Sequence, residues 1–234
     1  MTNLTDALLD PLLAGNRMGP RITYYDDATG ERIELSTVTL ANWATKTANL
    51  LRDELGAGPG SRIAVLLPPH WQTAAVLLGV WWIGAEVTLS GPADIALCTA
   101  DRLAEADDAV AGDQMGEVAV LSLDAFGKSV PDLPIGVTDY ATAVRVHGDQ
   151  IVPERFPGPA LDGRSCDEVL AQARRRAESL GLSAGDRVMS LTALPVEDLL
   201  AVFAVGASLV QVTNPDPALL ERRQESEKIT RTLD

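Results

Sequence analysis

Two loops of this sequence carry the side chains best suited to acid–base chemistry. Each follows an apolar run of strand length: His70, one of only two histidines, comes after RIAVLL, and Glu197 comes after RVMSL. An imidazole and a carboxylate that face each other across a cleft can act as acid and base. Ligands of open α/β sheets sit beyond the carboxyl ends of the strands, so we expect any small-molecule cleft at these loops. Its predicted lining is Pro68, Pro69, His70, Trp71, Thr192, Ala193, Leu194 and Glu197.

No nucleophile accompanies this pair. Ser90, Ser190 and Ser208 all lack the G-x-S-x-G elbow that exposes a catalytic serine at the end of a strand. We therefore assign no catalytic residue. A hydrolase or isomerase that uses His70 and Glu197 remains an alternative, and it would lose its activity in the variant His70→Ala.

Other patterns that suggest ligand chemistry have a simpler structural interpretation. Gly127–Ser129 matches only the end of a Walker A loop, and the first glycine of that motif would fall on a serine inside a predicted strand. The glycines of Gly56–Gly60 follow a helix and open a strand, which is the reverse of a dinucleotide fingerprint. The acids at 105, 107, 108 and 113 lack the loop glycine of a calcium site and indicate a solvated helix face. Trp81 and Trp82 lie in an apolar helix, where aromatic residues usually belong to the core. We predict no metal and no cofactor.

Composition excludes several classes of partner. The formal charge of −14 opposes binding to nucleic acid or to an anionic membrane, because phosphate contacts need clustered lysine and arginine. Cys98 and Cys166 are isolated, so we expect neither a disulfide framework nor a zinc site. The N-terminus is acidic and has no signal-peptide pattern, and the apolar stretch near residues 74–85 is too short to span a bilayer. We expect a cytoplasmic protein.

The sequence contains an internal repeat. LGAGPGSRIAVL at residues 55–66 and LGLSAGDRVMSL at residues 180–191 share five of twelve residues, and LLGVWWIGAEV then aligns with LLAVFAVGASL. Each copy predicts helix, turn, strand, helix and strand. Right-handed crossovers would make each copy a parallel βαβ unit. The sequence therefore predicts an α/β fold of two βαβ-type subdomains, with mainly parallel sheets and helices on both faces.

The remaining segments complete this architecture. Residues 4–14 predict a short helix, RITYYDDATGERIEL a hairpin, and residues 40–55 a helix. Further strands are expected at IALCT and GEVAVLSL with a helix between them, and a capping box at Ser165–Glu168 opens another helix. A polar tail that could be helical follows ASLVQV. We divide the chain into a first subdomain (residues 1–124), an irregular proline-rich connection (125–163) and a second βαβ unit with the tail (164–234), possible parts of one compact domain.

The two copies resemble a known superfamily. The run ANLLRDELGAGPGSRIAVLLPPHWQTAAVLLGVWWIGAEVTL is similar to the first subdomain of the adenylate-forming enzymes, which include acyl-CoA synthetases, peptide-synthetase adenylation domains and luciferases. AESLGLSAGDRVMSLTALPVEDLLAVFAVGASLVQV is similar to their second subdomain. The likeness covers most of residues 21–212 and rests on packing and turn residues. It implies the fold of the N-terminal part of these enzymes, and it says less about activity.

The residues that the superfamily uses for ATP are missing from this sequence. The resemblance implies a Ser/Thr/Gly-rich phosphate loop ending in Pro-Lys-Gly before the second subdomain, and DQIVPERFPGPALDGRS stands there instead. The adenylate and ribose motifs have no counterpart after Val212. None of the three lysines (Lys46, Lys128, Lys228) matches the catalytic lysine of the small C-terminal domain. In the family, a histidine or aromatic residue after the second-copy strand often lines the acyl pocket, and residues 196–198 replace it here.

Three functional hypotheses follow. The first is a non-catalytic, truncated relative of acyl-CoA synthetases that binds a small molecule or a protein. A homo-oligomer or a protein partner would then cover the apolar face left by the missing half. The second is half of a split ligase that a partner polypeptide completes. The third is the hydrolase or isomerase built on His70 and Glu197.

Overall fold

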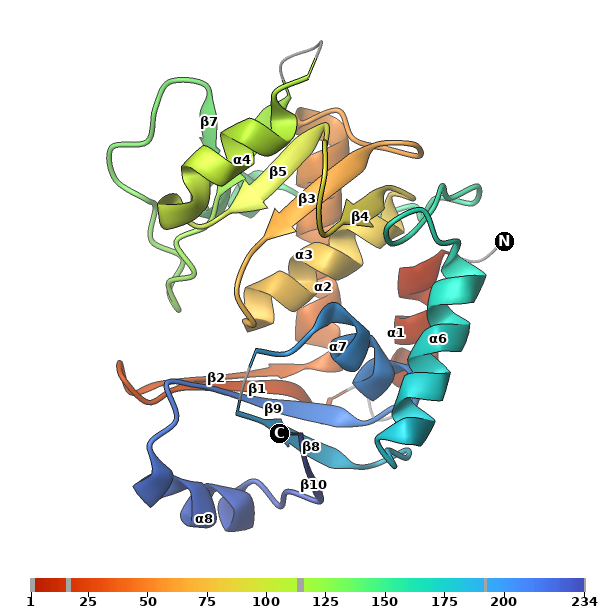
Figure 1. Cartoon of the computed structure of the whole chain (residues 1–234), viewed down its shortest axis with the longest axis vertical. Coiled ribbons are helices and arrows are strands. Elements are labelled where there is room, and N and C mark those ends of the chain that lie inside the picture. The colour runs from red at the N-terminus through yellow and green to blue at the C-terminus, as the bar shows by residue number, and fades with distance from the viewer. Residues whose placement is uncertain (1–2, 16–17, 113–115, 192, 234) are drawn as a thin grey trace. The chain divides into compact units, whose positions relative to one another are not determined.

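The computed structural model describes residues 3–15, 18–112, 116–191 and 193–233. The chain forms two compact units, each built around one five-stranded sheet (Figure 1). The first unit comprises Met1–Asp6, Ala41–Pro68 and Gln72–Val169, and the second comprises Ala7–Leu40, Pro69–Trp71 and Leu170–Asp234. Helices α1 (Leu4–Ala14), α2 (Thr37–Asn49) and α6 (Cys166–Ser179) each contain residues of both units.

The sheet of the first unit is parallel throughout. Its strand order is β4-β3-β5-β6-β7. The strands are β3 (Arg62–Leu66), β4 (Glu86–Thr88), β5 (Ile95–Cys98), β6 (Glu117–Val120) and β7 (Val137–Asp139). The first crossover leads from β3 to β4 and the next from β5 to β6, in opposite directions along the sheet. Right-handed connections therefore place the two crossover helices, α3 (Trp71–Trp82) and α4 (Leu103–Val110), on opposite faces.

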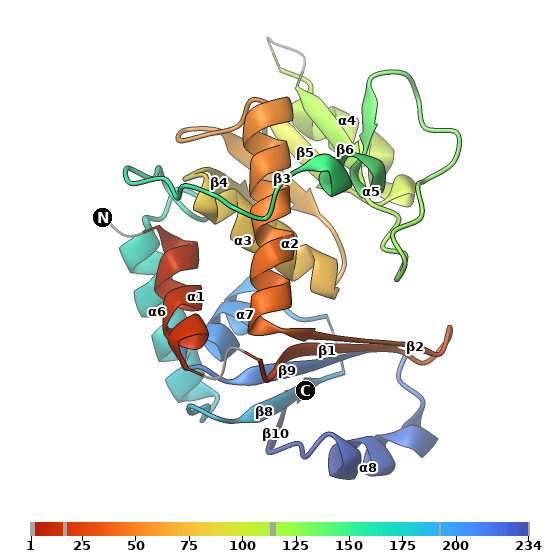
Figure 2. The same ribbon diagram turned by 180° about the vertical axis from the view of Figure 1, so that it is seen from behind.

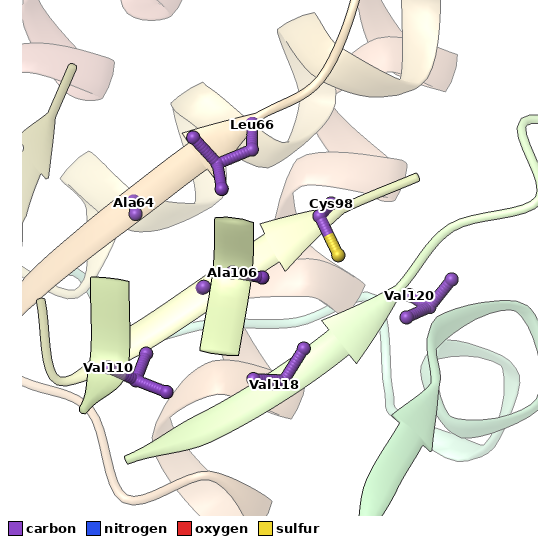
Figure 3. Close-up of a cluster of buried hydrophobic side chains, with 8 residues drawn as sticks. Ala64, Leu66, Cys98, Ala106, Val110, Val118 and Val120 are labelled. Atoms are coloured by element: carbon purple, nitrogen blue, oxygen red, sulfur yellow. The ribbon is translucent and has the colours of Figure 1, made fainter. Parts of the chain in front are cut away.

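Each face of this sheet carries a helix layer. Beneath α4, small and branched side chains of three strands interdigitate with Ala106 and Val110 (Figure 3). On the other side, α2 runs against α3, as the reverse view shows (Figure 2). A Cβ on Gly79 of α3 would lie 2.9 Å from the carbonyl oxygen of Ala44 in α2, so the absence of a side chain allows the two helices to approach closely. The helix α2 continues into a π-helical turn (Leu50–Glu54) before β3. After β7 come α5 (Tyr140–Ala143) and a 3-10 turn (Val144–Val146), and another such turn (Ala100–Arg102) precedes α4.

The sheet of the second unit has the order β10-β8-β9-β1-β2. Its strands are β1 (Pro20–Asp26), β2 (Glu31–Ser36), β8 (Arg187–Ser190), β9 (Ser208–Thr213) and β10 (Arg231–Leu233). Only the hairpin β1–β2 is antiparallel, so the carboxyl ends of β1, β8, β9 and β10 share one edge. The helix α7 (Val196–Ala204) covers one face and α8 (Pro217–Ser226) the other (Figure 1).

The predicted α/β architecture is confirmed. Both copies of the repeat form a parallel βαβ unit, β3-α3-β4 and β8-α7-β9, and the hairpin, the capping box and the helical tail are present. The observed units have other bounds than the predicted division of the chain. The hairpin joins the second sheet, because β1 pairs with β9 over the register Ile22–Leu209 to Asp26–Thr213. Residues 125–163 belong to the first unit. Strand β10 was not expected. No helix in the described ranges has the length and apolar character needed to cross a membrane.

Candidate functional site

The segment that stands in place of the phosphate loop is hydrogen-bonded to its own unit at several points between Glu154 and Ser165. The backbone N–H of Glu154 donates to the carbonyl of Trp82, that of Gly158 to Gly84, and that of Asp162 to Val87. Leu161 also forms a parallel bridge to Val87, so the segment extends the sheet beside β4. The indole Nε1 of Trp81, which is 2% exposed, donates to the carbonyl of Ala160 at 2.8 Å.

The end of this segment is a tight turn closed by a carboxylate. Asp162 and Gly163 have φ angles of +45° and +78°. The N–H of Gly163 donates to the Glu86 carboxylate at 2.5 Å, and those of Ala160 and Leu161 point to the carbonyl of Arg164. This turn holds a negative carboxylate, whereas a phosphate-binding loop presents N–H groups that are free to donate.

The capping box then begins α6. The N–H and the hydroxyl of Ser165 donate to the Glu168 carboxylate, and the N–H of Glu168 donates to Ser165 Oγ. The Ser165 hydrogen bonds lower the pKa of Glu168, which keeps a negative charge at the start of the helix. The helix end that would face a phosphate is therefore already occupied by the chain's own carboxylate.

His70 lies against the sheet of the second unit. Its ring stands edge-on to Tyr24 of β1 at a centroid distance of 4.4 Å and is tilted against Trp71 at 5.5 Å. The side chain is 7% exposed. Burial lowers the pKa of His70 to about 3, although the negative charge of Asp26 acts to raise it. The imidazole is therefore neutral at physiological pH. A base with so low a pKa accepts a proton poorly in neutral solution.

A row of three polar side chains lies near the carboxyl edge of this sheet. The register pairs Tyr24 with Gln211 and Gln211 with Ser190, so the three side chains share a face. All are buried, and the pKa of Tyr24 is raised by burial, partly offset by a hydrogen bond with Thr213. The Ser190 hydroxyl is fully buried and has no hydrogen bond to the described residues. The sequence predicted the hairpin that contains Tyr24, but the neighbours of this side chain follow only from the strand order.

The loop after β8 is partly exposed. Ala193 and Pro195 are exposed and Leu194 is half-buried, and Thr192 lies outside the described residues. Glu197, in the first turn of α7, is half-buried near Arg176. Its neighbour Asp198 is buried and binds Arg176 through two hydrogen bonds of 2.5 and 3.1 Å. The His70–Glu197 pair and the ligand cleft stay predictions.

The other motifs occupy structural positions. Lys128 follows a turn in which its N–H and that of Phe126 donate to the Asp124 carboxylate. Glu105 forms an exposed pair with Arg102, whereas Asp113 lies outside the described residues. Within the described ranges, no group of three or more metal-binding side chains comes together.

Comparison with known proteins decides the family. A protein from Mycobacterium tuberculosis (strain ATCC 25618 / H37Rv), described as a TIGR03089 family protein, is 65% identical over 239 residues, which cover 99% of this chain and 98% of that protein. The chain belongs to the TIGR03089 family. No protein-family model matches it.

Solved structures show which fold this TIGR03089 family member has. The acyl-CoA synthetase of Brucella canis matches 99% of this chain with a TM-score of 0.76 at 19% identity, and the acetoacetyl-CoA synthetase of Streptomyces lividans matches 98% with the same score and identity. The N-terminal domain of FACL13 from Mycobacterium tuberculosis matches 99% with a TM-score of 0.70 at 17% identity. The chain spans 47%, 42% and 62% of these three chains. It therefore has the fold of the N-terminal part of adenylate-forming acyl-CoA ligases.

Proposed function

We propose that this protein binds a small molecule at the carboxyl edge of the sheet of its second unit and forms no acyl-adenylate by itself. The observation that carries the second half of this proposal is the hydrogen bonding of residues 153–165. Three of these residues are prolines, which have no N–H. Nine others donate their N–H groups within the chain: Glu154, Phe156, Gly158, Ala160, Leu161, Asp162, Gly163, Arg164 and Ser165.

A phosphate-binding loop works by the opposite arrangement. Its glycines let the backbone approach the phosphates, and its N–H groups point inward and are free to donate. Here the corresponding donors are bonded to carbonyl and carboxylate oxygens of the same unit. Binding ATP in that place would require several of these bonds to break together, each of which leaves a polar group without its partner.

The ligand half of the proposal rests on the edge where four parallel strands end. Ligands of open α/β sheets sit at such edges. The half-buried Leu194 and the exposed Ala193 offer apolar contact there, and Ser190 Oγ is a buried hydroxyl without a hydrogen bond in the described structure. The neutral His70 ring packed on Tyr24 adds an apolar floor, which favours a ligand with an apolar body.

The adenylation half is tested with Mg–ATP. We expect no saturable heat in calorimetry up to about 1 mM nucleotide, and no exchange of pyrophosphate into ATP with a mixture of carboxylic acids. A full-length acyl-CoA ligase of the same fold is the positive control. Exchange by the purified chain would refute this half. Exchange that arises only after a second polypeptide is added would replace it with the split-ligase hypothesis.

The ligand half is tested with a non-hydrolysable acyl-adenylate analogue. We expect saturable binding that Leu194→Asp weakens about tenfold or more, since it places a charge against the apolar body of the ligand. Leu219→Asp, the same substitution at a leucine of α8 that is 40% exposed, is the matched control and is expected to bind normally. No binding by the folded wild-type chain, or equal loss in both variants, would refute a ligand site at this edge.

A further inference from the structure

Arg21 is a buried cation with an unusual set of partners. It is the second residue of β1, and the residue is 6% exposed. Its Nε donates to Thr37 Oγ1 at 3.2 Å, and its Nη1 donates to the carbonyls of Gly206 and Ala207 at 3.1 and 2.5 Å. These two carbonyls follow the C-terminus of α7, where the helix dipole favours a positive charge.

No carboxylate is among the described partners of Arg21. Asp186 lies in the same region, but its carboxylate accepts from the N–H and hydroxyl of Ser183 and from Thr230 Oγ1. Burial lowers the pKa of Arg21, and the positive charge of Arg187 lowers it further. The hydrogen bonds that Arg21 makes to the described residues use Nε and Nη1, which leaves Nη2 as the nitrogen that a ligand can reach. A buried charge without an ionic partner is costly, so an anion at this place would stabilise the fold.

Arg21 lines a cavity of about 550 Å³ in the second unit, a volume within the range of small-molecule pockets. The cavity opens at the amino ends of the strands, where Pro20 and Ser208 begin β1 and β9. The side chains of Leu8, Leu12 and Phe203 give it apolar walls, and all three are buried. The exposed Arg174 of α6 supplies a second positive charge in the lining.

We propose that this cavity binds a small organic anion whose carboxylate or phosphate group accepts from Arg21 Nη2 while its apolar body packs on Leu12 and Phe203. The site is separate from the one in the proposed function, because it lies at the amino edge of the sheet. Arg174 attracts the same anion from the lining. Arginine suits the role, since its charge persists at any physiological pH and its N–H groups match the oxygens of both head groups.

The test uses one apolar body with three head groups. The purified chain is titrated in a calorimeter with 2-naphthoate, 2-naphthyl phosphate and the neutral 2-naphthamide. We expect saturation by at least one anion with a dissociation constant below about 1 mM and none by the amide. The preferred anion identifies the head group. Absence of saturation by both anions, or equal binding of the amide, would overturn the proposal.

Two neighbouring arginines of α6 provide a matched pair of variants. Arg174→Gln is expected to weaken binding about two- to fivefold, as for an exposed ion pair, whereas Arg175→Gln, which alters an exposed arginine outside the cavity lining, is expected to leave it unchanged. Arg21→Gln is expected to weaken it about tenfold or more. Equal effects of the two α6 variants would count against the site.

Arg21 also holds the turn after α7, so a loss of binding in its variant must be separated from a loss of folding by a second readout. In the wild-type chain, the anion is expected to shift the backbone amide resonances of Gly206 and Ala207, whose carbonyls share the guanidinium. Shifts confined to the loop after β8 would place the ligand at the other edge and overturn the proposal.

Discussion

Gly84 and Gly206 allow the packing of the proline-rich segment to be measured against an internal standard. They occupy the same position in the two copies of the repeat, LLGVWWIGAEV and LLAVFAVGASL. Their φ angles are +72° and +81°, so an alanine at either position would be similarly strained. Their surroundings differ. A Cβ on Gly84 would meet Glu154 Cγ at 2.8 Å and Pro157 Cα at 3.0 Å, whereas a Cβ on Gly206 would meet only Leu12 Cδ2, at 3.7 Å.

Two contributions set the expected loss of stability: the strained backbone at both positions and the crowding of an added Cβ at Gly84. A left-handed conformation costs an L-residue about 1–2 kcal/mol, and the loss of glycine's freedom in the unfolded chain returns about 0.4–1 kcal/mol. Gly206→Ala should therefore lower the free energy of unfolding by about 1 kcal/mol. Gly84→Ala adds a clash with backbone, for which overpacking is worth about 1–3 kcal/mol. We expect a total of about 2–4 kcal/mol, and the difference between the variants measures how firmly residues 154–158 are held.

Urea unfolding followed by circular dichroism and by tryptophan fluorescence measures both values, with two probes because the two units can unfold separately. Limited trypsin digestion gives a second readout, since cleavage after Arg155 should accelerate in Gly84→Ala and not in Gly206→Ala. Equal destabilisation of the two variants, with unchanged cleavage at Arg155, would refute the conclusion that this segment is fixed against β4. It would also remove the main support for the proposal that the chain does not bind ATP.

Three further predictions concern the second unit. Asp27→Asn should lower the free energy of unfolding by about 3–5 kcal/mol, because Arg223, 2.6 Å away and 7% exposed, would stay buried without its carboxylate partner. The double variant Asp27→Leu/Arg223→Leu should lower it less, since it removes both charges. A larger loss in the double variant than in Asp27→Asn would contradict this. His70 has a lowered pKa, so the stability that its neutral form contributes is complete above pH 6.5 and is lost as the pH falls toward 3. In urea unfolding, the free energy of unfolding should be about 2–3 kcal/mol lower at pH 4.5 than at pH 7 because of this group. The variant His70→Gln should lose less stability than the wild type between these two pH values. Ser190→Ala should leave the free energy of unfolding unchanged or raise it by up to about 1 kcal/mol, since it removes a buried hydroxyl that has no hydrogen-bond partner in the described structure. A clear drop in the melting temperature would contradict this and show that the hydroxyl has a partner.

The elements that the sequence predicted well are those whose signal is local. Apolar runs such as RIAVLL and RVMSL are largely buried and form parallel strands inside their sheets. The capping box at Ser165 and the glycine turns at Gly60 and Gly185 depend on residues within one helix turn or one loop. The repeat added a non-local constraint, because two copies of one pattern predict two copies of one packing unit.

The partners of the hairpin depended on distant residues and were not predicted. Nothing in RITYYDDATGERIEL reveals that β1 pairs with β9, nearly the whole chain away. Arg21 was missed for the same reason, since the carbonyls that it binds, Gly206 and Ala207, lie 185 and 186 residues further along the chain. The strand β10 is three residues long, and neither its pairing with β8 nor the Arg223–Asp27 ion pair before it has a local signal in the sequence.

For the segment that stands in place of the phosphate loop, the sequence and the structure give different evidence against a phosphate site. The sequence shows that DQIVPERFPGPALDGRS lacks the lysine and the Ser/Thr/Gly run of a phosphate loop, but proline-rich segments can be disordered and leave a site open. The structure shows a segment whose N–H groups are bonded to Trp82, Gly84 and Val87, all of which belong to the first copy of the repeat. Since these are backbone contacts, no side-chain pattern predicts them. Restoring a lysine and a few glycines would therefore not restore a phosphate site, because the segment would still have to leave the edge of β4.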